Sequence, residues 1–216
     1  MAQPVSCPIC KKRRPERFCP AQGEKICAVC CGTERERTLD CPADCVYLIA
    51  AHRYEREHRQ LLAAEEIPFP GLEITRSLIH EQQALVSGLA HTLVTFAEEQ
   101  RALTDPDALA AIIALAETYR TLNSGIYYEK PPDAPLQAAL YAALASFIQQ
   151  YKQQSTGANL ATVKDSAIFP VLVYLARICR GSTNGRPRSR LFLQVLRAGS
   201  PPSQDQPAEA SRIIVP

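Results

Sequence analysis

The sequence predicts an all-α protein in which a cysteine-rich N-terminal module precedes a bundle of about five helices. Apolar residues recur at helical spacing through most of the chain after residue 45, and no segment alternates like a half-buried strand. Eight of the nine cysteines lie between Cys7 and Cys45, where apolar side chains are too few to build a core. We therefore expect a metal-stabilised module at residues 1–45, a helical bundle at 46–198 and a disordered tail at 199–216.

The expected helices are placed by apolar periodicity and by residues that begin and end helices. The first begins at Pro42 and ends near Ile67, before a proline-rich break. Asp105 and Pro106 predict the start of a central helix, as an N-cap followed by a proline in the first turn. In order, the predicted helices are residues 42–67, 73–101, 105–123, 133–154, 167–180 and 189–197. The tail from Gly199 is too polar and proline-rich to fold alone.

The composition suits a chain with a core of its own and no membrane span. Its 216 residues are 46% hydrophobic and 21% charged. The longest candidate apolar run, residues 167–176, is much shorter than the roughly 18 residues that a membrane helix needs. The start of the chain lacks the basic and apolar regions of a secretory signal peptide. We therefore expect a soluble, cytoplasmic protein whose thiols stay reduced.

The cysteine spacing is the most specific chemical feature of the sequence. Cys-x2-Cys pairs begin at Cys7 and at Cys27. A turn between paired cysteines brings both thiolates to one tetrahedral ion, which is the arrangement of structural zinc sites. Eight cysteines suffice for two zinc ions. We expect an interleaved arrangement, with Cys7, Cys10, Cys27 and Cys30 on one ion and Cys19, Cys31, Cys41 and Cys45 on the other.

The last two cysteines are expected to begin the first long helix. With Cys41 near the N-cap and a proline after it, Cys45 lies one turn further along the same face. The amino end of a helix also favours thiolates. His52 follows Cys45 by seven residues and shares its helical face, so it is an alternative ligand in place of Cys30 or Cys31.

Three other kinds of cysteine site compete with zinc. Disulfides are disfavoured because no signal peptide is found and the helical part needs no cross-links. A Cys-x2-Cys redox pair normally sits in a βαβ setting, and no strand is expected. An iron–sulfur cluster uses the same ligands and stays open as an alternative, although it usually needs four cysteines rather than eight. Zinc held by four thiolates is structural, because no coordination position is left for a substrate.

The cysteine order resembles that of a known class of zinc fingers. It runs Cys-x2-Cys, Cys-x2-Cys-Cys and Cys-x3-Cys and leads into a helix that carries His52. Over residues 7–58 this is similar to the small interleaved two-zinc fingers of the MYND, HIT and B-box kind. The strings CCGTERER at residues 30–37 and CPADCVYL at 41–48 also look like those of an uncharacterised group of small bacterial proteins with a Cys-rich N-terminal zinc-binding module. The finger families imply protein–protein contact more often than catalysis.

No catalytic set emerges from the sequence. Glu55 and His58 have the spacing of one di-iron ligand pair, but the second pair that such a site needs is missing. Phosphate-binding, dinucleotide-binding and nucleophile-elbow motifs are also missing. The loop at residues 123–129 is rich in functional groups, yet a helix cap with packed aromatics explains it more simply. We therefore expect a protein-interaction or scaffold protein with structural zinc, no catalytic activity and a protein partner that the sequence does not identify.

Nucleic-acid binding is the alternative function. Residues 166–197 contain six arginines and no acid, whereas residues 61–165 have a formal net charge of −6. The contact residues under this alternative are Arg180, Arg186, Arg188 and Arg190. So few phosphate contacts, without aromatic side chains beside them for stacking, predict weak binding that is lost near physiological salt. The same arginines can instead dock on the acidic helices.

Overall fold

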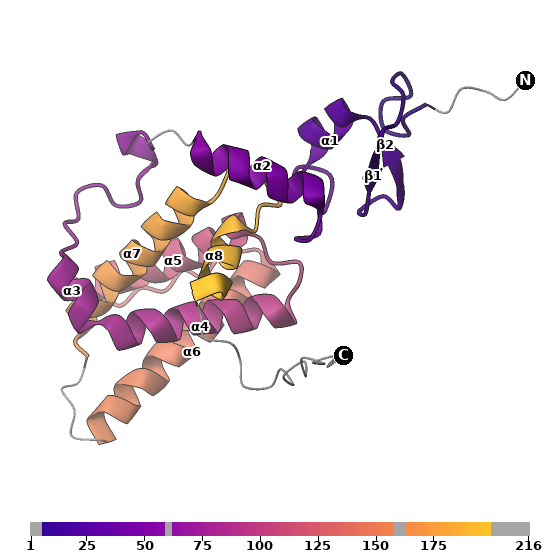
Figure 1. Ribbon diagram of the computed structural model, residues 1–216. Coiled ribbons are helices and arrows are strands. Elements are labelled where there is room, and N and C mark those ends of the chain that lie inside the picture. Colours follow the sequence, from indigo (N-terminus) through magenta and orange to yellow (C-terminus); the bar gives the residue numbers. More distant parts are fainter. Residues whose placement is uncertain (1–5, 59–61, 158–162, 200–216) are drawn as a thin grey trace, which may run out of the picture.

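The computed structural model of the chain describes residues 6–58, 62–157 and 163–199 (Figure 1). These residues form eight α-helices and one short two-stranded hairpin, so the described chain is mostly helical, as predicted. None of its helices combines the length and the apolar composition that crossing a bilayer requires. The predicted tail lies outside the described residues, apart from Gly199, which ends the last helix.

The N-terminal module contains a β-hairpin that the sequence pattern does not predict. Strands β1 (Arg17–Cys19) and β2 (Glu24–Ile26) pair antiparallel, with Phe18 opposite Lys25. Gly23, at φ +70°, lies in the turn between them. Three residues per strand are too few for an alternating pattern to be visible. The expectation that no segment forms a strand is therefore wrong for this module.

Two helices follow the hairpin. Helix α1 (Ala28–Glu34) has Cys27 as its N-cap, and its seven residues are too few to show a helical period in the sequence. Helix α2 (Val46–Glu57) begins after Pro42, the predicted start. The N–H group of Cys45 donates to the Pro42 carbonyl at 3.1 Å and closes a turn before α2. Cys45 is the N-cap of α2. The prediction that the last two cysteines share a helical face is therefore wrong.

The other predicted helices are recovered with changes at their ends. The remaining elements are η1, a 3₁₀ turn (Ala64–Glu66), α3 (Arg76–Glu81), α4 (Gln83–Glu99), α5 (Asp105–Asn123), α6 (Pro135–Gly157), α7 (Asp165–Ser182) and α8 (Leu191–Gly199). The helix predicted at 42–67 ends at Glu57 instead. The helix predicted at 73–101 is divided at Gln82, which leaves helical geometry at φ −99° and ψ 19°. The last four predicted helices differ from the observed ones by a few residues at most.

The bundle is built around α5 and α7, which pack against each other in its centre (Figure 1). Leu115 on α5 and Leu172 on α7 are fully buried, and α4, α6 and α8 pack around this pair. The buried apolar cluster of the bundle contains no residue of the cysteine-rich module. In the described part of the module, Ile26 and Leu39 are the only buried apolar side chains besides cysteines. The two parts therefore have separate cores, and that of the module is small.

A buried carboxylate joins α5 to α8. Asp105 accepts hydrogen bonds from the N–H groups of Phe192 and Leu193 and from the hydroxyl of Ser189. It thereby caps the amino end of α8, while Thr104, and not Asp105 as predicted, is the N-cap of α5. Burial raises the pKa of Asp105. This contact anchors one end of the segment between α7 and α8, which carries three of the arginines that the sequence singles out.

Gly88 marks a close approach of α4 and α6. A Cβ atom at Gly88 would overlap the ring of Phe147 on α6. We expect Gly88→Ala to lower the free energy of unfolding by about 1–3 kcal/mol, although alanine is the better helix former. Urea denaturation followed by circular dichroism measures this change. The matched control is Gly181→Ala in α7, where nothing lies within 4 Å of the added atom; an equal loss there would contradict the role of Phe147.

Candidate metal centre

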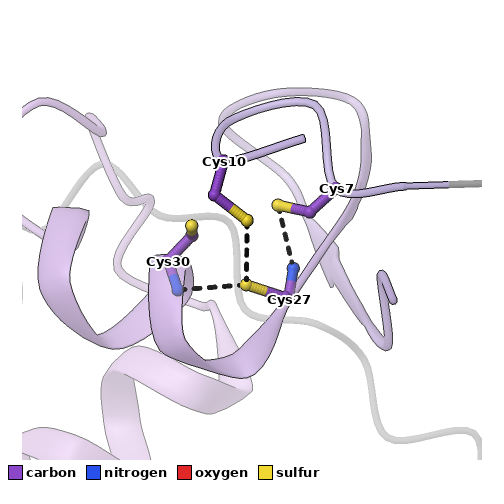
Figure 2. A group of neighbouring side chains, drawn as sticks. All are labelled: Cys7, Cys10, Cys27 and Cys30. Carbon is purple, nitrogen blue, oxygen red and sulfur yellow. Dashed lines mark hydrogen bonds between the residues drawn. The ribbon is translucent and has the colours of Figure 1, made fainter. Parts of the chain in front are cut away.

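Four cysteine sulfurs meet at one point of the N-terminal module (Figure 2). The Sγ atoms of Cys7, Cys10, Cys27 and Cys30 all lie within 4.8 Å of one another. Among the described residues, this is the one group of three or more Cys, His, Asp or Glu side chains whose ligand atoms come so close. They are the four cysteines that the spacing assigns to one ion. The group can therefore hold a metal ion.

A turn, the hairpin and the start of a helix position the four sulfurs. Cys7 and Cys10 belong to a turn in which the Lys11 N–H bonds to the Cys7 carbonyl at 2.7 Å, with Lys11 at φ +53°. Cys27 follows β2 directly, and its sulfur accepts a hydrogen bond from the Cys30 N–H at 3.4 Å. Figure 2 shows Cys30 on the first turn of α1, facing the two loop cysteines. The hairpin thus returns the chain so that the second pair meets the first.

The sulfur spacing suits one tetrahedral ion. The sulfurs of Cys10 and Cys27 are 3.9 Å apart. A tetrahedron with zinc–sulfur bonds of about 2.3 Å has an edge of about 3.8 Å. A disulfide requires about 2.05 Å between sulfurs, and all the cysteines are free thiols. The Cys27 N–H also donates to Cys7 Sγ at 3.3 Å, a contact that stabilises a thiolate.

Backbone donors lower the pKa values of these thiols, whereas burial raises them. The N–H groups of Lys12 and Arg13 lower the pKa of Cys10 to about 6. Burial opposes the ionisation of Cys7, but the N–H groups around its sulfur outweigh burial and lower its pKa. Burial and the neighbouring cysteines raise the pKa of Cys30 to about 12. The four sulfurs therefore do not all ionise unaided near neutral pH, whereas a bound cation allows them to do so.

The other four predicted ligands do not form a second group of this kind among the described residues. Cys19 and Cys31 are buried beside the first group, whereas Cys41 and Cys45 are only partly buried. Burial, together with the charges of Cys19 and Cys45, raises the pKa of Cys41, so these three thiols are electrostatic neighbours. The structure therefore brings together one of the two predicted sets of four.

His52 does not join the sulfur group. Its Nε2 atom lies 3.0 Å from Oε2 of Glu36, and both side chains are more than nine-tenths buried. Asn184 donates to the same Glu36 oxygen at 2.7 Å and to Glu55 at 3.2 Å. The alternative that the sequence left open, in which His52 replaces Cys30 or Cys31 as a metal ligand, is therefore not the arrangement in this structure. His52 instead belongs to a buried polar junction between the module, α2 and the segment that follows α7.

Two arginines of the predicted nucleic-acid contact lie at this junction. The Arg186 side chain donates to the carbonyls of Gly32 and Arg35 at the end of α1. The N–H group of Arg188 donates to the carbonyl of Glu36 at 2.9 Å. The Arg188 side chain makes no hydrogen bond or ion pair with another described residue. Arg186 thus binds the carboxyl end of the helix whose first turn carries Cys30.

The other two arginines are also engaged within the protein. Arg180 forms an ion pair with Glu66. Arg190 pairs with Asp40 at 2.6 Å and donates to the carbonyl of Leu103 at 3.0 Å. The sequence left open whether the acid-free stretch meets phosphates or docks on the protein. In the described residues, three of the four predicted contact arginines dock on the protein.

The residues that join the module to the bundle are not predicted by the sequence pattern. Glu36 stands in a run of alternating acids and arginines that is typical of a solvated surface. Asn184, its partner, lies 148 positions away in a polar loop. The one usable sign is Gly185 after Asn184, which is typical of a turn. This sign predicts the turn, but it does not predict that Asn184 in the turn bonds to Glu36.

We predict that Arg186→Ala loosens the module from the bundle. The change removes the two hydrogen bonds to the carbonyls of Gly32 and Arg35, and charged donors of this kind contribute roughly 1.5–3 kcal/mol. Hydrogen exchange of the amides in residues 28–36 is expected to become about tenfold faster. The matched control is Arg188→Ala, which removes the same charge from a side chain that has no described partner. Equal exchange rates in the two variants would contradict this role of Arg186.

Comparisons with known proteins gave no further guide to the site. Neither the family models, nor the curated proteins, nor the solved structures with which the chain was compared gave a match.

Proposed function

We propose that the chain is a zinc-binding protein in which structural zinc orders an N-terminal protein-interaction or scaffold module. The observation that carries this proposal is the group of four cysteine sulfurs within 4.8 Å of one another. Four thiolates complete the tetrahedral coordination of zinc and leave no position for water or substrate. The ion then stabilises the module and takes no part in a reaction. A reducing compartment such as the cytoplasm keeps these thiols available.

The sulfur spacing favours a single ion over an iron–sulfur cluster. A cluster places several iron atoms and sulfides between its cysteines, which holds their sulfurs further apart than one ion does. The 3.9 Å between the sulfurs of Cys10 and Cys27 is close to the edge of a zinc tetrahedron. Four thiolates in this geometry are also the usual structural ligands of zinc. We therefore assign zinc to the site.

A second zinc ion belongs to the same proposal. Its ligands are Cys19, Cys31, Cys41 and Cys45. The first two lie in the buried cluster of the module, and Cys41 packs against it. The segment from Cys41 to Cys45 is a turn outside α2, so it can close on an ion without unwinding a helix. Burial and the charges of Cys19 and Cys45 raise the pKa of Cys41, and this supports the proposal because a shared cation favours the thiolates.

Exposed apolar side chains support protein contact as the role of the module. Ile9 is 37% exposed, Phe18 54% and Val29 48%. Ile9 and Val29 each precede the second cysteine of a pair, so they flank the same group of sulfurs. Exposed apolar side chains on a rigid support are typical of protein-binding surfaces. The resemblance to interleaved two-zinc fingers points to the same role.

Nucleic-acid binding is the weaker proposal. Of its four expected contacts, Arg180, Arg186 and Arg190 hold other parts of the chain together. Only the Arg188 side chain is left without a described partner. So few free cations give weak, salt-sensitive binding.

The zinc proposal predicts metal content and the effect of metal removal. We expect two zinc ions per chain by elemental analysis, and about one in a Cys19→Ser, Cys41→Ser variant. A strong chelator is expected to unfold the module while most of the helical circular dichroism survives, because the bundle core contains no module residue. Less than one zinc ion per chain, or iron with visible absorbance, would contradict the proposal. Loss of the whole helical signal would contradict the independence of the two parts.

The proposed protein contact predicts that surface changes in the module abolish partner binding. In extracts of the native cell, the zinc-loaded chain is expected to retain a protein that a Phe18→Asp, Val29→Asp variant does not retain. Ile126→Asp is the control, since Ile126 is 64% exposed but lies after α5. Retention by the module variant, or equal loss in the control, would show that this surface is not the interface.

A further inference from the structure

A cavity of about 600 Å³ lies where the cysteine-rich module meets the bundle. Its walls come from the loop after α1, from α2 and the residues that follow it, and from the end of α7 with the next loop. Residues that matter for its chemistry are Arg37, Tyr54, Arg56, His58, Glu66 and Arg180. The volume is typical of sites for small molecules. The cavity is distinct from the sulfur group, none of whose cysteines lines it.

Positive charge prevails in this cavity. Four arginines line it, against two glutamates. Glu66 is already paired with Arg180, and Glu55 accepts a hydrogen bond from Asn184. Neither Arg37 nor Arg56 makes a side-chain hydrogen bond or ion pair with another described residue. Two guanidinium groups are therefore available to an anion, and their planar forks match the oxygens of a phosphate.

The cavity also offers an aromatic surface. The rings of Tyr54 and His58 stack with their centroids 4.0 Å apart and 21° between their planes. The Nδ1 atom of His58 lies 2.9 Å from the carbonyl of Tyr54, so this hydrogen bond fixes the imidazole ring. Tyr54 is 62% exposed, which leaves a face of its ring open. A fixed aromatic pair beside free cations is suited to a ligand that has both a flat ring and a phosphate.

We propose that this cavity binds a phosphate ester of mononucleotide size, with the phosphate at Arg37 and Arg56 and the flat ring against Tyr54 and His58. A free mononucleotide and the terminal nucleotide of a single strand present the same chemistry. The site goes beyond the zinc proposal and uses none of its ligands. Its walls come from both the module and the bundle, so a bound ligand stabilises their docking.

Titration calorimetry on the full-length, zinc-loaded chain tests the proposal. The probes are the four ribonucleoside 5′-monophosphates, the four nucleosides, inorganic phosphate and a 5′-phosphorylated single-stranded octanucleotide. We expect at least one monophosphate to bind about tenfold or more tightly than its nucleoside and than phosphate alone. Arg37→Ala with Arg56→Ala is expected to weaken this binding about tenfold or more, and Tyr54→Ala to weaken it severalfold. All three side chains are at the surface, and thermal melts monitor the fold of the variants.

A charge-matched variant provides the control. Arg14→Ala with Arg76→Ala removes two exposed arginines outside this cavity and is expected to leave the affinity unchanged. Tighter binding of the octanucleotide, with the same loss in the cavity variants, supports the site and identifies a strand end as its ligand. Three results would each overturn the proposal: no binding of any probe at about 10 mM, nucleosides as tight as monophosphates, or equal loss in the control. Zinc content, measured on the same samples, distinguishes this failure from a failure of the metal proposal.

Discussion

The close approach of four cysteine sulfurs, all within 4.8 Å of one another, is the constraint on which the N-terminal module depends. Besides cysteines, the described module buries only Ile26 and Leu39 as apolar side chains, too few to offset the entropy of ordering its chain. Its thiols also compete for charge, because the pKa of Cys10 is lowered to about 6 while that of Cys30 is raised to about 12. A divalent ion would end this competition and supply the missing stability. On this view, the turn of Cys7 and Cys10 and the start of α1 form one unit because both carry ligands of the same ion, with the hairpin joining them.

Helix α1 is one of the links between this unit and the bundle. Helix α1 carries Cys30 in its first turn, and the carbonyls at its other end accept hydrogen bonds from Arg186. Because α1 has only seven residues, its sulfur end and its Arg186 end lie about two turns apart. The segment that holds Arg186 is itself anchored, since Ser189 donates to the buried carboxylate of Asp105 at 2.7 Å. Loss of the metal would therefore loosen the docking of the module before it affects the core of the bundle.

Sequence patterns predict the features of this protein that depend on periodicity or on spacing along the chain. The helix at residues 105–123 is predicted closely, with its N-cap placed one residue too late, because its apolar side chains recur over several turns between strong end signals. The four grouped sulfurs follow from the two Cys-x2-Cys pairs. The hairpin is missed because three residues per strand carry no pattern. The pairing of His52 with Glu36 is missed because it depends on where α2 begins and on a loop far along the chain.

The arginines show why counting charge along a chain does not locate a binding surface. Residues 166–197 contain six arginines and no lysine, a composition that first indicates phosphate contact. A guanidinium group has five N–H donors, so it can satisfy several backbone carbonyls that lie outside regular elements, as lysine cannot do in a fixed geometry. Arg177 does this with the carbonyls of Pro68 and Leu72, and Arg190 with that of Leu103. Once such contacts are assigned, Arg188 is the one arginine of the stretch whose side chain keeps no described partner, and the unpaired arginine charge at the cavity between module and bundle belongs to the loop after α1 and to α2. An arginine that binds a ligand is therefore expected where its guanidinium group has no partner within the protein. At the junction of module and bundle, Arg37 and Arg56 meet this condition.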